Sequence, residues 1–184
     1  MKITKILKEE HKIIEKMLDI LEKISENSKI EKEVNYEHLA EIVDFIRTFA
    51  DKCHHHKEED LLFPAMERAG IPKEDGPIGV MLTEHEIGRA YVREIASGIE
   101  QKDKEKIEKN ASSYITLLRE HIFKENNILY MMADAHLSDK TQNELFNKFK
   151  KFEREEIGEG VHRKYHNLVE KLGKIYLRRN GRNS

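Results

Sequence analysis

Residues 53–60 read CHHHKEED and place three imidazoles and three carboxylates within one helical pattern. A core helix does not carry that many polar groups without a bound partner, because burying unpaired charges is costly. A histidine followed one helical turn later by a glutamate presents both side chains on the same face. Imidazole and carboxylate together suit a transition-metal ion. This run therefore predicts a metal site, whose remaining ligands must come from elsewhere in the chain.

Helical periodicity leaves open which residues of this run point inward. Extrapolation from the apolar residues before the run favours His56 with Asp60, whereas extrapolation back from those after it favours His55 with Glu59. The inward face drifts through the segment, as it does when a straight helix joins a supercoiled seam. Both registers therefore stay open on periodicity alone.

Three further histidines lie on apolar stripes. His11, His85 and His121 each take a position on the stripe of a separate predicted helix, and Glu125 follows His121 at the same four-residue spacing. A single buried histidine is commonly a core residue bonded to a backbone carbonyl. A whole set of such groups would need a separate partner for each, so metal ligation is favoured for the set.

Five helical regions follow from the 3.6-residue periodicity of the apolar residues. They are expected over residues 2–26, 36–68, 78–99, 103–133 and from 138 onwards. Pro64 should bend or end the second region, and Gly158 with Gly160 should kink or break the fifth. The predicted fold is all-α: an up-down-up-down four-helix bundle over residues 1–135, with a C-terminal helical extension over 136–184 packed on it.

The topology brings the four helix-borne histidines to one level. In an up-down-up-down bundle, the beginnings of the first and third helices lie beside the ends of the second and fourth. At a rise of 1.5 Å per residue, all four histidines then lie roughly 10–20 Å from the same end of the bundle. Four imidazoles and two carboxylates at one depth suit two metal ions bridged by the carboxylates.

Composition narrows the function classes. The 184 residues are 38% hydrophobic and 37% charged, with a formal net charge of −2, so no basic field favours nucleic acid or an anionic membrane. The single cysteine, Cys53, excludes an internal disulfide and is expected to pack as a small hydrophobe. The chain shows no apolar signal segment and no run of membrane length. We expect a cytoplasmic protein.

The ordered set of motifs resembles the hemerythrin-like, or HHE cation-binding, family over residues 1–135. The motifs are Glu-Glu-His at 9–11, a His-x-x-x-Glu run before Leu-Phe-Pro at 62–64, Glu-His at 84–85 with Arg89, and a second His-x-x-x-Glu at 121–125. In that family the ligand histidine lies eight residues before the phenylalanine of Leu-Phe-Pro, which here is His55, with Glu59 as its bridging partner. The resemblance thus resolves the open register.

The resemblance implies a non-haem di-iron centre, bridged by carboxylates and an oxo or hydroxo group, although manganese or zinc also suits these donors. Its expected ligands are His11, His55, Glu59, His85, His121 and Glu125. The neighbouring His54, His56, Glu58 and Asp60 are then expected in solvent or supporting the ligands. His162 and His166, with Glu155 or Glu159, are expected on an exposed polar face rather than in a further metal site.

One departure from the family pattern bears on function. Oxygen-carrying hemerythrins place two ligand histidines on the third helix, and the second position here is Gly88 or Arg89. The chain therefore resembles the four-histidine, two-glutamate branch, which includes bacterial iron-centre-repair proteins and the iron-sensing domain of an F-box protein. That branch implies reaction with oxygen, peroxide or nitric oxide, or looser iron retention, rather than stable oxygen carriage.

We therefore expect a protein that binds or senses a diatomic, oxygen or nitric oxide, or that handles iron in oxidative or nitrosative stress protection. A di-iron enzyme that reduces peroxide or nitric oxide is the alternative, and a metal-free structural bundle is the third reading. The sequence predicts neither a nucleic-acid nor a membrane partner. It names no protein partner and leaves both a monomer and a homodimer open.

Overall fold

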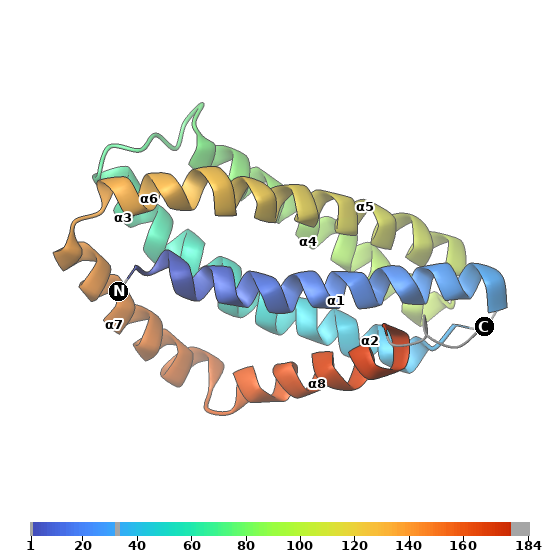
Figure 1. The fold of residues 1–184 in the computed structure, drawn as a ribbon. Helices are drawn as coiled ribbons and strands as arrows, with labels where there is room; N and C mark the ends of the chain where they lie inside the picture. The colour runs from blue at the N-terminus through green and yellow to red at the C-terminus, as the bar shows by residue number, and fades with distance from the viewer. Residues whose placement is uncertain (1, 32–33, 178–184) are drawn as a thin grey trace, which may run out of the picture.

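A computed structural model describes residues 2–31 and 34–177, and every regular element in this part of the chain is a helix. The described helices of residues 4–136 form four rods, followed by α7 and α8. The rods lie side by side in an antiparallel bundle, and α7 and α8 run along one side of it (Figure 1). The predicted all-α bundle with a C-terminal helical extension is therefore confirmed. None of the described helices is both long and apolar enough to cross a membrane.

The first and third rods are continuous α-helices: α1 (Thr4–Glu31) and α4 (Pro77–Gln101). The prediction that the first helix ends near residue 26 was wrong, because residues 27–31 contain neither glycine nor proline to stop it. The third helix has Pro77 in its first turn, where the missing N–H costs nothing.

The second and fourth rods are interrupted by π-helical turns. The second consists of α2 (Tyr36–Phe45), η1 (Ile46–His55), η2 (Lys57–Leu62) and α3 (Phe63–Arg68). The fourth consists of α5 (Lys104–Lys124), η3 (Glu125–Leu129) and α6 (Tyr130–His136). Pro64 neither ends nor breaks its helix, because it lies in the first turn of α3, directly after a π-helical turn, where its missing N–H is tolerated.

These π turns change which residues of the second rod face the core. An α-helix has 3.6 residues per turn, and a π-helical turn has more. Inserting π turns therefore lets residues at a regular four-residue spacing share one face. All the residues on this face are at most 4% exposed: Ile46, Ala50, His54, Glu58, Leu62 and Met66. These π turns cause the drift of the inward face that was expected for this segment.

The extension consists of α7 (Asp139–Phe152), η4 (Glu153–Ile157) and α8 (Val161–Tyr176). Ser138 caps α7 by accepting a hydrogen bond from the backbone N–H of Thr141. Gly158 and Gly160, at φ of 97° and 84°, interrupt the helix between η4 and α8 as predicted. The helix α8 packs on α1, and α7 packs on η2.

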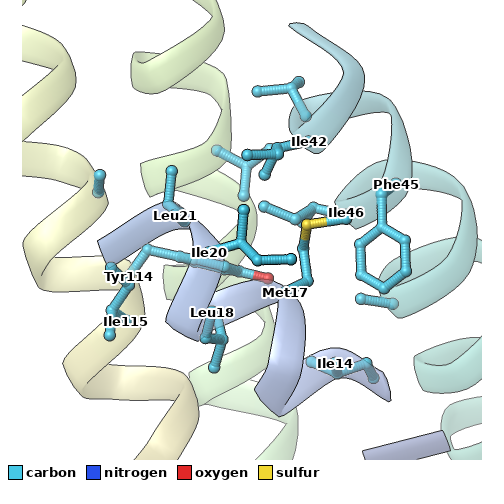
Figure 2. Close-up of a cluster of buried hydrophobic side chains, with 14 of the residues drawn as sticks. Ile14, Met17, Leu18, Ile20, Leu21, Ile42, Phe45, Ile46, Tyr114 and Ile115 are labelled. Atoms are coloured by element: carbon cyan, nitrogen blue, oxygen red, sulfur yellow. The ribbon is translucent and has the colours of Figure 1, made fainter. Parts of the chain in front are cut away.

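The hydrophobic core is divided into two clusters. One contains Ile14 to Ile24 of α1 with facing residues of α2, α4, α5 and α8, and part of it appears in Figure 2. The other is built around Leu7, Phe63 and Met81 and the helix α7. The inward-pointing histidines and glutamates lie along the helices between these clusters. Both clusters keep this polar layer away from water.

Candidate metal centre

The polar layer contains two groups of buried metal-donor atoms. Within each group the atoms lie within 4.8 Å of one another. One group is His55, Glu58, His85 and His121, and the other is His11, His54, Glu58 and Glu125. Because Glu58 belongs to both groups, its carboxylate joins them into one site, to which all four rods of the bundle contribute residues.

Glu125 also spans the site. Its two carboxylate oxygens lie 3.1 Å from His11 Nε2 and 3.2 Å from His121 Nε2, one histidine from each group. Glu58 Oε2 lies 3.6 Å from His85 Nε2 and 3.7 Å from His54 Nε2, again one from each. Two carboxylates thus each stand between the two sets of imidazoles, which is the arrangement that bridging ligands of a metal pair require.

Each of the five imidazoles is held through its Nδ1 atom by an oxygen outside the donor groups. The pairs are His11 with Asn126 (2.9 Å), His54 with Glu10 (2.9 Å), His55 with Asp51 (3.4 Å), His85 with Glu59 (2.6 Å) and His121 with Glu84 (2.8 Å). An Nδ1–H that donates to such an oxygen leaves the lone pair on Nε2, the tautomer that ligates a metal. The shared pattern orients all five rings toward one centre.

Several donor atoms in the layer are buried and find no hydrogen-bond partner in the part of the chain that the structure describes. They are His54 Nε2, Glu58 Oε2 and both carboxylate oxygens of Glu125. The contacts of Glu125 to the imidazoles are short but lack hydrogen-bond geometry. Buried polar atoms in native proteins are nearly always satisfied, so these atoms fit bound cations. The residues present therefore suit a metal pair.

The electrostatics of the layer also favour added positive charge. Burial and the nearby Glu125 carboxylate raise the pKa of Glu58 well above its ordinary value. Burial acts in the same direction on Glu125, but His121 and other imidazoles outweigh it and hold the pKa of Glu125 well below its ordinary value. Two buried carboxylates this close push their pKa values apart, and a cation between them would let both ionise.

The six residues predicted from sequence are placed as follows. His11, His55, His85, His121 and Glu125 lie in the two donor groups. Glu59 lies outside them: its carboxylate accepts hydrogen bonds from His85 Nδ1 and, at 2.8 Å, from Arg89.

The structure places Glu58 between the groups, although the sequence suggested a surface or supporting position for it, because the π turns rotate the register of the second rod by one residue. His54 likewise joins a donor group. His56 and Asp60 pair at 2.8 Å on the surface.

Sequence reasoning missed several supporting residues. Glu10 and Glu84 each precede a predicted ligand by one residue, yet each bonds a histidine on a different helix. Tyr130 is buried and donates its hydroxyl hydrogen to Glu58. The four-residue spacing of apolar residues on either side of the 53–60 run was a signal that could have identified His54 and Glu58.

His166 is exposed as expected, but His162 is half-buried and joins Glu10, Cys53 and Glu153 in a third group of possible metal donors. His162 Nε2 lies 3.3 Å from Cys53 Sγ and 3.6 Å from a carboxylate oxygen of Glu153. The Lys57 ammonium group lies among these residues and bonds both Glu153 and Glu10. Because this ammonium already supplies a cation, we interpret the cluster as a partly buried ion-pair network.

Comparison with protein families shows that residues 2–133 match the model of the hemerythrin HHE cation-binding domain. The matched region contains the four rods of the bundle almost completely and stops before α7. Comparisons with curated proteins and with solved structures gave no significant match.

Proposed function

The chain belongs to the hemerythrin HHE cation-binding domain family, and from this premise we propose that it holds two non-haem iron ions in the polar layer of the bundle. We propose further that this centre binds or senses oxygen or nitric oxide, or handles iron during oxidative or nitrosative stress. The observation that carries the proposal is the Glu58 carboxylate shared by two groups of buried donor atoms.

The proposed ligands differ from the sequence-based set at the second rod. One ion would be held by His11 and His54, and the other by His55, His85 and His121, with Glu58 and Glu125 between them. Iron bound by imidazoles and carboxylates supplies one-electron redox chemistry and exchangeable positions for a diatomic.

The protein's own groups prepare this site. Tyr130 fixes one oxygen of Glu58 by a hydrogen bond, while the other oxygen stays without a partner. Glu10 and Glu84 fix the rings of His54 and His121. The hydrophobic clusters along the bundle keep bulk water away, which strengthens electrostatic interactions within the layer.

Metal analysis tests the proposal directly. Protein purified without oxygen from iron-replete cells should contain about two iron ions per chain, with manganese and zinc measured in the same sample. A content near zero for all three metals would contradict it. Stopped-flow spectroscopy of the reduced protein with oxygen and with nitric oxide then separates stoichiometric binding from the steady turnover expected of a reductase.

Metal affinity should fall as the pH is lowered. Burial opposes the charged form of His121, but the carboxylates of Glu125 and Glu84 outweigh it and raise the pKa of His121 to about 9. At pH 7 the metal-free ring is therefore protonated, and because neutral imidazole is the ligating form, binding must release this proton. Burial lowers the pKa of His54 to about 4, so that ring is neutral over the same range.

The measurement is anaerobic titration of metal-free protein with Fe(II) in weakly buffered solution at pH 7, followed with a pH indicator. We expect release of at least one proton per chain, and weaker binding in chelator competition at pH 7 than at pH 8.5. Equal affinities at the two pH values, with no proton release, would contradict the prediction.

A further inference from the structure

A cavity of about 180 Å³ opens beside the histidines of one donor group. His55 and His85 line its inner end, and its walls include the apolar side chains of Ile46, Val92 and Leu118. A cavity of roughly 150 Å³ with apolar walls is large enough to bind benzene. This space is therefore larger than a diatomic requires and could hold the body of a small organic molecule.

The lining of the cavity includes a tyrosine whose hydroxyl is buried without a partner among the described residues. Tyr114 is 2% exposed and lines the cavity, and its hydroxyl makes no hydrogen bond with any described residue. Its ring lies among hydrophobic side chains of the core (Figure 2). Burial raises the pKa of Tyr114 well above its ordinary value, so the hydroxyl keeps its proton and can donate it to a ligand oxygen. Leaving such a group unsatisfied costs stability, which a bound acceptor would recover.

Cationic side chains line the cavity toward the surface. Arg47 and Arg93 are exposed, and neither forms an ion pair within the described residues. The third arginine, Arg89, is bonded to Asp51, which is one of the two carboxylates in the lining. The other, Glu84, is bonded to His121 and Lys124. Since both carboxylates already have cationic or imidazole partners, two guanidinium groups remain for an anionic ligand.

From these features we propose that the cavity binds a small carboxylate with a compact apolar body and a second oxygen substituent at its far end. The carboxylate would meet Arg47 and Arg93, the body would lie against Ile46 and Val92, and the second oxygen would accept a hydrogen bond from Tyr114. That this ligand would lie beside a metal pair rests on the function proposed above. Binding of the ligand to the cavity does not depend on that function.

Gly88 gives a direct way to close the cavity. It lines the cavity, and a Cβ atom added there would lie 3.5 Å from Tyr114 Cε2, an ordinary contact distance. Gly88→Ala should therefore be accommodated and leave most of the space open. Gly88→Leu should fill the space with its longer side chain.

The test uses 4-hydroxybenzoate as the probe, with benzoate and the neutral 4-hydroxybenzyl alcohol for comparison, in calorimetry on the protein as purified. We expect 4-hydroxybenzoate to bind at least tenfold more tightly than the neutral alcohol, because charge-assisted hydrogen bonds are the stronger kind. Tyr114→Phe should weaken 4-hydroxybenzoate about fivefold and leave benzoate unchanged. Gly88→Leu should abolish binding, and Gly88→Ala should retain it within about twofold.

Equal binding of the acid and the alcohol, or undiminished binding by Gly88→Leu, would overturn the proposal. Tyr114→Phe keeps the proposal testable if Gly88→Leu does not fold, since unchanged 4-hydroxybenzoate affinity in that variant would also contradict it. Metal content is measured on the same samples. Metal-free protein that binds the probe would refute the proposed metal pair alone, and metal-loaded protein that does not bind it would refute the pocket alone.

Discussion

Glu58→Ala is expected to lose both metal ions. The Glu58 carboxylate belongs to both groups of donor atoms, so its removal would take a ligand from each of the two proposed ions at once. Its replacement by alanine also removes one of the two buried carboxylates, Glu58 and Glu125, that would balance the charge of bound cations. Metal analysis after gel filtration should show the content falling from about two ions per chain to less than about one-tenth of that.

Glu59→Ala is the matched control, one residue further along the same rod. Glu59 holds the His85 ring through Nδ1 and contacts Arg89, so its loss disturbs the orientation of one ligand. Removing such a supporting partner typically lowers metal affinity about 10–100-fold, and a tightly bound metal pair should survive purification. Complete loss in Glu59→Ala with retention in Glu58→Ala would show that the register expected from sequence is the right one.

The same comparison separates two histidines. His54→Ala should reduce metal content strongly, because His54 Nε2 is a buried donor without a partner. His56→Ala should leave it unchanged, because His56 pairs with Asp60 on the surface. The register expected from sequence instead predicts that His54→Ala is largely harmless, so this pair decides between the two interpretations independently of the glutamates.

The fold was predictable from sequence because it depends on long apolar stripes with few interruptions. The position along the bundle axis was predictable for three of the histidines. His11, His85 and His121 lie on regular α-helical segments, where a 3.6-residue period holds over several turns. The second rod was not predictable in this way. Its π turns arise from local hydrogen bonding that apolar periodicity does not record, and they change the register by one residue.

The carboxylates that support the histidine rings could not be predicted from sequence for a related reason. Glu10 contacts His54 from another helix, and Glu84 likewise contacts His121 from another helix. These contacts depend on how the rods are rotated against one another, which spacing within one helix does not determine. The sequence therefore indicates which helices contribute to the candidate site. It does not determine which side chains would ligate a metal and which would support the ligands.

The second large effect is expected at Lys57, which connects the extension to the bundle. Its side chain is fully buried, and its ammonium group bonds Glu10 on α1 and, at 2.7 Å, Glu153 on η4. Lys57→Met should lower the free energy of unfolding by about 3–5 kcal/mol, because it leaves a buried carboxylate without its cation. Urea unfolding of metal-free protein measures this loss apart from any contribution of ligation.

Two controls connect this loss to burial rather than to charge alone. Lys171 bonds Glu41 at 2.9 Å but is half exposed, so Lys171→Met should cost less than about 1 kcal/mol. The double variant Glu10→Gln with Lys57→Met should recover most of the stability, because it removes the unpaired charge. Similar losses in Lys57→Met and Lys171→Met would contradict the assignment.

Acid should produce the same loss in the native sequence. Burial disfavours the Glu10 carboxylate, but His54 and Lys57 outweigh it and lower the pKa of Glu10 from 4.5 to about 2. A carboxyl group with a lowered folded-state pKa contributes stability above pH 4.5, and this contribution disappears as the pH falls toward 2. The stability of Lys57→Met should therefore depend less on pH across this window, because one of the groups that hold the Glu10 pKa down is gone.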